Sequence, residues 1–155
     1  MNPDTTRRMR IPSFRLPGAM ARLGARLPQW PHAVALCTAL NLAVRMGILP
    51  RDGIAQLEQR TFRVVVADAG GEARFTWRNG MAQPLLGDRR DYDLTLRADA
   101  SAFLRLLARQ EDPDTLFFNR ELAIEGDTEL GLIVKNMLDA VDLAELFRIF
   151  RRRAA

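Results

Sequence analysis

The sequence predicts an α+β fold in which a mostly antiparallel sheet is covered on one face by helices and is preceded by a helical N-terminal extension. Between residues 61 and 97, apolar and polar side chains alternate in short segments separated by turn-forming residues. From residue 99 onward, apolar residues recur every three or four positions, which is typical of amphipathic helices. A sheet with one apolar face needs a second layer, and the helices that follow it can supply that layer. A length of 155 residues suits one globular domain with an appendage.

The first thirty residues form a basic, proline-rich segment. They hold six arginines against the single acid Asp4, and their prolines limit them to short helical pieces, of which residues 18–27 are the best candidate. They contain no apolar run followed by a small-residue cleavage site, so we do not expect a secretory signal. We expect two parts, a segment over residues 1–30 and a compact domain over residues 31–155.

Residues 33–49 are the most apolar stretch. The predicted helix has one polar stripe, formed by Thr38, Asn41 and Arg45. The stretch is shorter than the ~20 residues that span a bilayer. Such a helix packs inside its own domain, which is the commoner case, or lies in a membrane interface or a protein groove. A short helical turn over residues 54–60 then leads into the sheet.

Four strands are predicted before residue 98. Segments 61–67 and 73–78 alternate on either side of a turn. The pair Asn79-Gly80 favours a tight hairpin, so segment 81–86 returns as a short edge strand. Segment 92–97 alternates again and completes the group.

The covering layer begins directly after these strands. Asp99 or Ser101 can cap a helix that runs to Arg109. Residues 116–118 form an apolar cluster. In residues 121–125 apolar and polar side chains alternate, which predicts one further strand.

Two amphipathic helices complete the layer. Asp127 is a good N-cap for a helix with apolar residues at i, i+3, i+4 and i+7. Asp142 begins a second helix that continues to residue 150, and Arg151–Arg153 suit its C-terminus.

The sequence offers no catalytic or metal-binding set. His32 is the only histidine and Cys37 the only cysteine, and their spacing of five is close to one helical face but not on it. The alternative nucleophiles are Ser13 and Ser101, and Ser101 is interpreted as a helix cap. We therefore expect no enzymatic activity, no metal and no cofactor.

Charge is distributed unevenly along the chain. Residues 31–147 hold thirteen cations against eighteen acids, whereas residues 148–155 hold four arginines. An acidic body with basic ends fits anionic lipid headgroups better than nucleic acid. We expect a membrane surface as a partner and no nucleic acid.

A set of apolar residues between positions 103 and 150 remains after these exclusions. It fits an ordinary packed core, which is the commoner case, or a cavity for lipid. Periodicity alone does not distinguish the two.

Part of the chain resembles the sterol carrier protein type 2 lipid-binding family, in which the corresponding segments form a strand, a helix, and then a strand, Gly-Asp and helix. The matching segments are Tyr92–Ala98, Phe103–Leu107 and Phe117–Gly131. The stretch Glu125–Gly131, the basic start and the apolar helix near residues 33–49 are similar to the family's bacterial branch of ubiquinone biosynthesis accessory factors. The similarity covers about residues 40–150.

The resemblance implies that the sheet and the C-terminal helices enclose an apolar tunnel for lipid tails. It implies a non-catalytic accessory factor in oxygen-independent ubiquinone biosynthesis, cytoplasmic and peripherally associated with the inner membrane. Such a factor binds isoprenoid quinone intermediates, phospholipid or other lipids and presents them to enzymes, with the peptidase-like iron–sulfur proteins UbiU and UbiV as partners.

Two sets of residues follow as candidate sites. The residues expected to contact lipid are Phe103, Leu107, Phe117, Phe118, Leu122, Ile124, Leu130, Ile133, Val134, Met137, Leu138 and Val141. The residues expected to contact the membrane are Phe14, Arg15, Arg22, Arg26 and Trp30.

Three other functions stay open. The first is a protein-interaction adaptor with a solid core, whose helix over residues 33–49 docks on biosynthetic enzymes at the membrane. The second is a lipid esterase or transferase that uses Cys37 or Ser101. The third, arginine-driven RNA binding, is the weakest of the three.

Overall fold

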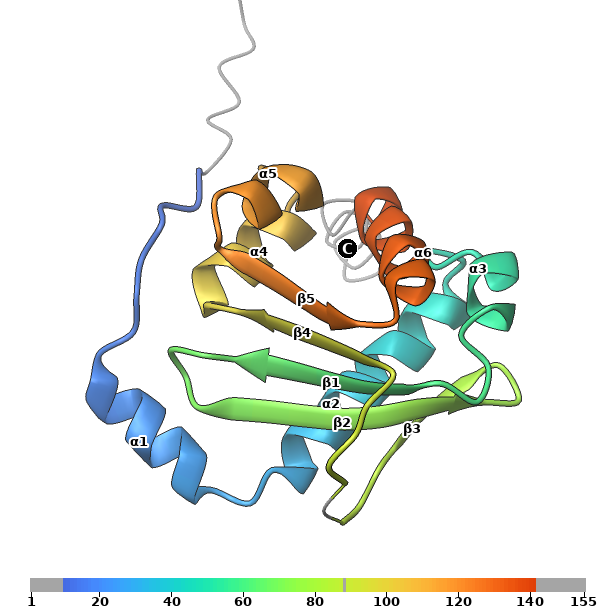
Figure 1. Cartoon of the computed structure of the whole chain (residues 1–155), viewed down its shortest axis with the longest axis horizontal. Coiled ribbons are helices and arrows are strands. Elements are labelled where there is room, and N and C mark those ends of the chain that lie inside the picture. The colour runs from blue at the N-terminus through green and yellow to red at the C-terminus, as the bar shows by residue number, and fades with distance from the viewer. Residues whose placement is uncertain (1–9, 88, 142–155) are drawn as a thin grey trace, which may run out of the picture.

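The computed structural model describes residues 10–87 and 89–141, and Figure 1 shows a five-stranded sheet with helices packed on it. The predicted helix over 142–150 and the arginines after it lie outside the described residues. In chain order the elements are α1 (Gly18–Arg26), α2 (Trp30–Arg45), α3 (Arg51–Ala55), β1 (Thr61–Val66), β2 (Gly71–Arg78), β3 (Met81–Pro84), β4 (Leu94–Ala98), α4 (Ala100–Leu107), α5 (Pro113–Phe118), β5 (Leu122–Gly126) and α6 (Thr128–Ala140).

The strand order is β3-β2-β1-β4-β5, and every neighbouring pair is antiparallel except the central pair β1–β4, which is parallel. The predicted α+β fold with a mostly antiparallel sheet is therefore confirmed, and the parallel pair is a feature that the sequence analysis did not include. It arises because the connection after β3 runs back across β2 and β1, so that β4 starts at the same end of the sheet as β1. Arg74 of β2 holds this connection through a 3.1 Å hydrogen bond to the carbonyl oxygen of Gly87.

Strand register places the apolar side chains on one face. Phe62 lies opposite both Phe75 and Leu94, and Val64 lies opposite both Ala73 and Leu96. The rings of Phe62 and Phe75 stack with their centroids 5.2 Å apart. Alternation in each strand thus adds up to one continuous apolar face across the sheet.

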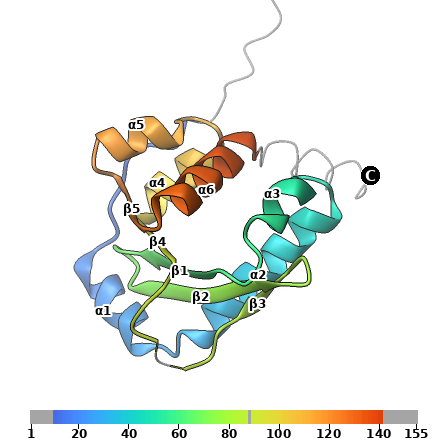
Figure 2. The ribbon, with the colours of Figure 1, turned by 45° about the vertical axis from the view of Figure 1, so that its right-hand side comes forward.

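The helices that cover this face form two groups, which Figure 2 shows on either side of the sheet's centre. Helix α2 packs across β2 and β3, whereas α5 and α6 contact β5, and α4 packs beside α6. Ala33 and Cys37 of α2 are buried, which supports the interpretation of α2 as a packing helix. Within its polar stripe, the Asn41 side chain accepts from the Ala82 amide at 2.8 Å and donates to the Ala82 carbonyl at 2.9 Å. Asn41 therefore pairs backbone groups of the edge strand β3.

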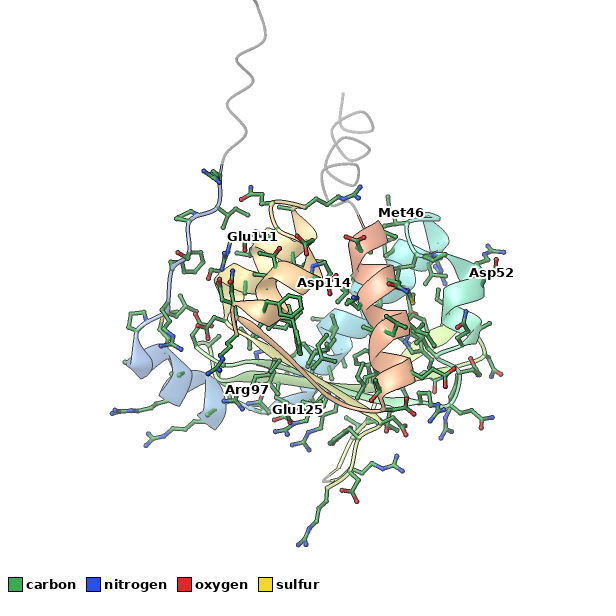
Figure 3. All side chains as sticks on the ribbon, turned by 45° about the horizontal axis from the view of Figure 1, so that its top comes forward. Met46, Asp52, Arg97, Glu111, Asp114 and Glu125 are labelled. Carbon is green, nitrogen blue, oxygen red and sulfur yellow. The ribbon has the colours of Figure 1, made fainter. Side chains whose placement is uncertain are left out.

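The opposite face of the sheet is charged. Glu72 accepts hydrogen bonds from Arg63, at 2.9 Å, and from Arg74. Figure 3 shows Arg97 and Glu125 on the side of the sheet away from α6. Burial raises the pKa of the Glu72 carboxyl, but the hydrogen bonds and charges of the two neighbouring arginines outweigh burial and hold it below its ordinary value of 4.5.

Two local predictions differ from the structure. Residues 116–118 were expected as an apolar cluster without helical structure, but they belong to α5. This helix forms because the Asp112 side chain caps it by accepting a hydrogen bond from the Thr115 amide at 2.8 Å. Helix α4 receives no side-chain cap from Asp99; the buried Asp68, in the turn between β1 and β2, accepts from the Ala100 amide at 2.8 Å instead. Both helices begin after an aspartate in extended conformation. The sequence therefore predicted where α4 begins, but not that Asp68 accepts the hydrogen bond from its first amide.

The charged face gives a prediction about pH. Because the pKa of Glu72 is lower in the folded protein, its ion pairs contribute stability above about 4.5, and this contribution is lost as the pH falls through the folded pKa. We expect Glu72→Gln to lower the free energy of unfolding by about 1 kcal/mol near neutral pH, with a difference from the wild type that shrinks as the pH falls below 4.5. Urea unfolding at several pH values measures this, with Glu125→Gln on the same face as the control. A Glu72→Gln penalty that does not change with pH would contradict the assignment.

Candidate functional site

The centre of the molecule is an apolar cluster shared by both helix groups. Its buried members include Cys37 of α2, Ile54 of α3, Trp77 of β2, Leu94 of β4 and Met137 of α6. Among the residues predicted to contact lipid, Leu130, Met137 and Val141 belong to this cluster. The structure thus brings α6 and α2 onto one common core over the sheet.

Half-buried apolar side chains border this cluster, and we call them the apolar seam. They are Leu36, Leu40, Ala43, Val44, Ile48, Val64, Leu107, Ile124, Ile133 and Val134. They come from α2 and the turn after it, from β1, and from α4, β5 and α6. Within the described residues α2 and α6 do not pack closely along each other, and the seam residues of both helices stay half-buried.

A second, smaller cluster lies under α4 and α5. Its buried members are Ala98, Ala102, Leu106, Leu116 and Leu122, and Phe103, Ile124 and Leu138 pack against it. Ile124 of β5 touches both clusters, so the predicted lipid-contacting residues of α4, β5 and α6 form one connected apolar region.

Two glycines set how closely the helices approach this region. A Cβ atom on Gly131 of α6 would lie 3.3 Å from Cγ2 of Ile124 and 3.5 Å from Cδ1 of Leu94, so α6 lies directly on the sheet there. A Cβ atom on Gly53 of α3 would lie 3.2 Å from the sulfur of Met137. The second contact brings α3, which follows α2 in the chain, against α6.

Phe117 and Phe118 lie apart from both clusters. Their side chains are 47% and 79% exposed, and their rings meet edge to face with centroids 5.9 Å apart. Helix α5 is short and buries only Pro113 and Leu116, so its last turn projects from the body. The structure therefore does not bring these two phenylalanines together with the other predicted lipid-contacting residues.

Three hollows of the described surface are open to solvent, and their lining residues lie largely outside the seam. A polar one of about 500 Å³ lies beside Thr61, Thr76 and Asp93, and another of about 520 Å³ lies between Arg10 and Leu138. The third, of about 430 Å³, is apolar and reaches the seam at Val44, next to Ile54 and Ala55.

The residues considered for catalysis are not arranged as a reactive set. Cys37 is buried, and burial raises the pKa of its thiol to about 11, so the nucleophilic thiolate is scarce near neutral pH. Ser101 is buried in the first turn of α4, while His32 is exposed at the start of α2. Among the described residues, no three His, Cys, Asp or Glu side chains are grouped so as to hold a metal ion.

The five residues predicted to contact the membrane are all exposed. Phe14 and Arg15 precede α1, Arg22 and Arg26 lie on it, and Trp30 begins α2. No helix in the described part of the chain is long and apolar enough to cross a bilayer.

Residues 49–139 match the SCP-2 sterol transfer family, and this region includes α3, all five strands and nearly all of α6. The chain belongs to the SCP-2 sterol transfer family. The resemblance inferred from the sequence is thus confirmed. Half of the apolar seam, from Val64 onward, lies within the matched region, and the other half comes from α2 and the turn after it, before residue 49.

Two comparisons show which proteins this chain is similar to in sequence and in fold. Over 59 residues, 38% of this chain, it is 56% identical to the ubiquinone biosynthesis accessory factor UbiT of Escherichia coli strain K12. The match spans 34% of that protein's length, about a third. The solved structure of the UbiJ-SCP2 ubiquinone synthesis protein shares the fold with a TM-score of 0.54 at 18% identity, over 70% of this chain and 97% of that one.

Six of the ten seam residues were not predicted from the sequence. The predicted lipid-contacting residues all follow position 102, whereas Leu36, Leu40 and Val44 of α2 and Val64 of β1 also border the cluster. The periodicity of α2 was visible, but only the tertiary structure shows that its apolar side meets the same cluster as α6.

The close packing of α6 gives a prediction about stability. In Gly131→Val the added branched side chain would collide with Ile124 and Leu94, so we expect the free energy of unfolding to fall by about 1–3 kcal/mol. Gly18→Val is the matched control, because a Cβ atom at Gly18 has nothing within 4 Å. Chemical unfolding of both variants measures the difference; equal stabilities would show that α6 does not rest on the sheet at Gly131.

Proposed function

We propose that this chain is a non-catalytic lipid-binding accessory factor in oxygen-independent ubiquinone biosynthesis. It holds isoprenoid quinone intermediates, or other lipids such as phospholipid, with the tail along the apolar seam. The observation that carries this proposal is the seam itself, a set of half-buried apolar side chains that come from both helix groups and border one core in a member of the SCP-2 family. The identity to UbiT supports the choice of pathway.

Burial of the tail supplies the binding energy in this proposal. Each CH₂ group removed from water contributes about 0.8 kcal/mol, so a few isoprene units suffice for tight binding. The side chains that we assign to tail contact are Phe103, Leu107, Leu122, Ile124, Leu130, Ile133, Val134, Met137, Leu138 and Val141, joined by Leu36, Leu40, Val44 and Val64. Phe117 and Phe118, which lie exposed on α5, are left out of this set.

The bound lipid is presented to partner proteins in the proposed function. We assign this role to proteins of the UbiU and UbiV kind, which would carry the iron–sulfur chemistry. The chain itself then acts without a metal or cofactor, in the cytoplasm and peripherally associated with the inner membrane. In this proposal the compact domain over residues 31–155 holds the lipid and the basic segment over residues 1–30 contacts the membrane.

A second candidate function is an adaptor with a solid core. Val34 and Leu42, on the outer side of α2, are 41% and 43% exposed and offer apolar contacts to a partner enzyme. In that case the seam would be closed by protein side chains and no lipid would be retained.

The two functions are separated by lipid retention in adjacent variants of α6. Ile133 is half-buried in the seam, whereas Leu132 is 54% exposed on the outside of the same helix. A carboxylate at position 133 would be unpaired against a lipid tail, so we expect Ile133→Asp to lower co-purified lipid roughly tenfold or more and Leu132→Asp to leave it unchanged. The measurement is mass spectrometry of organic extracts from protein purified without detergent, compared with a mock purification.

Each result of that measurement is decisive. Enriched polyprenyl phenols or ubiquinone in the wild type, lost in Ile133→Asp, would support a quinone-pathway carrier, and enriched phospholipid alone would support a general lipid binder. No lipid above the mock from folded wild-type protein would favour the adaptor. Normal lipid in a folded Ile133→Asp variant would show that the seam is not the lipid site.

A further inference from the structure

Helix α1 carries an apolar stripe that the rest of the described chain does not cover. Met20 and Leu23 of α1, and Leu27 directly after its last residue, are at positions i, i+3 and i+7 and are 49%, 63% and 50% exposed. Every residue of α1, all of which the structure describes, is exposed or half-buried. Adjacent exposed apolar side chains of this kind mark an interaction surface.

The helix is nevertheless fixed to the body by contact between backbones. A Cβ atom on Gly24 would lie 1.9 Å from the carbonyl oxygen of Ala69, and one on Gly70 would lie 2.0 Å from the carbonyl oxygen of Ala21. The side of α1 that holds Ala21 and Gly24 therefore lies against the turn between β1 and β2. At about 100° per residue, the apolar stripe lies roughly a quarter of a turn away from this contact.

Hydrogen bonds hold the chain on both sides of α1. Before the helix, the Leu16 amide donates to Asp68 at 2.9 Å, and the other carboxylate oxygen of Asp68 accepts from the Ala100 amide of α4. After the helix, the Gln29 side chain accepts from the Glu72 amide at 2.8 Å. The orientation of the apolar stripe relative to the sheet is thus built into the fold, and Figure 1 shows α1 at the end of the sheet distant from α3.

Charge identifies the occupant of this surface. Between Asp4 and Asp52 the sequence contains no acidic residue, and Arg15, Arg22 and Arg26 are exposed. At about 100° per residue, Arg22 and Arg26 lie beside the stripe, on the side away from the contact with the body. Exposed Phe14 precedes the helix and exposed Trp30 follows it, and aromatic side chains favour the headgroup level of a bilayer. An apolar stripe flanked by arginines and aromatic residues suits an anionic lipid surface.

We propose that the stripe Met20–Leu23–Leu27, flanked by Arg22 and Arg26, is a docking surface for an anionic phospholipid bilayer. The helix lies flat in the headgroup region and stays attached to the body through Gly24 and Gly70. This inference rests on the proposed peripheral membrane association and specifies which surface makes the contact.

Co-sedimentation of the full chain with vesicles tests the proposal. We expect binding to vesicles of phosphatidylglycerol and phosphatidylcholine, and much weaker binding to phosphatidylcholine alone. Leu23→Glu should weaken the partition coefficient about tenfold or more. Arg22→Ala/Arg26→Ala should weaken it roughly thirtyfold, since each basic residue at an anionic surface contributes about fivefold.

Matched controls lie at the other end of the molecule. Leu132→Glu changes an exposed leucine of α6, and Arg45→Ala/Arg51→Ala removes two exposed arginines near α3; both should bind vesicles as the wild type does. Absence of wild-type binding to anionic vesicles, or wild-type binding by Leu23→Glu, would overturn the proposal, and an acidic protein groove would then be the occupant.

The lipid content of the same variant separates this proposal from the proposed function. Leu23 lies outside the seam, so we expect Leu23→Glu to lose vesicle binding while its co-purified lipid stays at the wild-type level. A parallel loss of co-purified lipid in a folded Leu23→Glu variant would overturn the assignment of α1 to docking alone. The loss of lipid in Ile133→Asp tests the seam whatever the vesicle experiment shows.

Discussion

The sheet turns most of its large apolar side chains to one side, and the positions of the covering helices depend on keeping that side out of water. The pairing that places Phe62 opposite Phe75 and Leu94 fixes this arrangement, because a slip of one residue in any strand would expose its apolar set. The charged residues are confined to the opposite face for the same reason. Glu72 is held there between two arginines, where solvent can reach the group and its neighbours can compensate its charge.

The order of elements along the chain explains why the helices that cover the apolar face of the sheet form two separate groups. Helix α2 precedes the sheet and packs across β2 and β3, whereas α4, α5 and α6 come after the parallel crossover and lie towards β5. The central strand β1 lies between the two groups, and Val64 on its apolar side stays half-buried. A protein gains about 25 cal/mol for each Å² of apolar surface removed from water, so a band of incompletely covered residues is surface that another apolar molecule can still bury. A flexible tail fits such a band because it needs contact area and no particular polar partner.

The sequence predicted well those features that depend on local periodicity. The alternating segments became the five strands, Asp127 caps α6 as expected, and the isolated helical piece of the N-terminal segment is α1. The parallel pairing of β1 with β4 was not predicted, because alternation is the same for parallel and antiparallel neighbours. Phe117 and Phe118 were grouped with the apolar residues by composition, but six residues of α5 bury only one side of that helix.

The long-range contacts of the N-terminal segment were the hardest features to foresee, and they connect its two proposed roles. Asp68 accepts hydrogen bonds from Leu16, just before α1, and from Ala100, at the start of α4. Helix α4 carries Phe103 and Leu107, which pack on the two apolar clusters. One buried carboxylate therefore ties the proposed docking helix to a helix of the proposed lipid site. Because this link is short, a bilayer that fixes the orientation of α1 also fixes the orientation of the seam relative to the lipid surface. A carrier that must take up or release a tail at a membrane gains from such a fixed orientation, since the rotational freedom of the bound protein is reduced before the lipid moves.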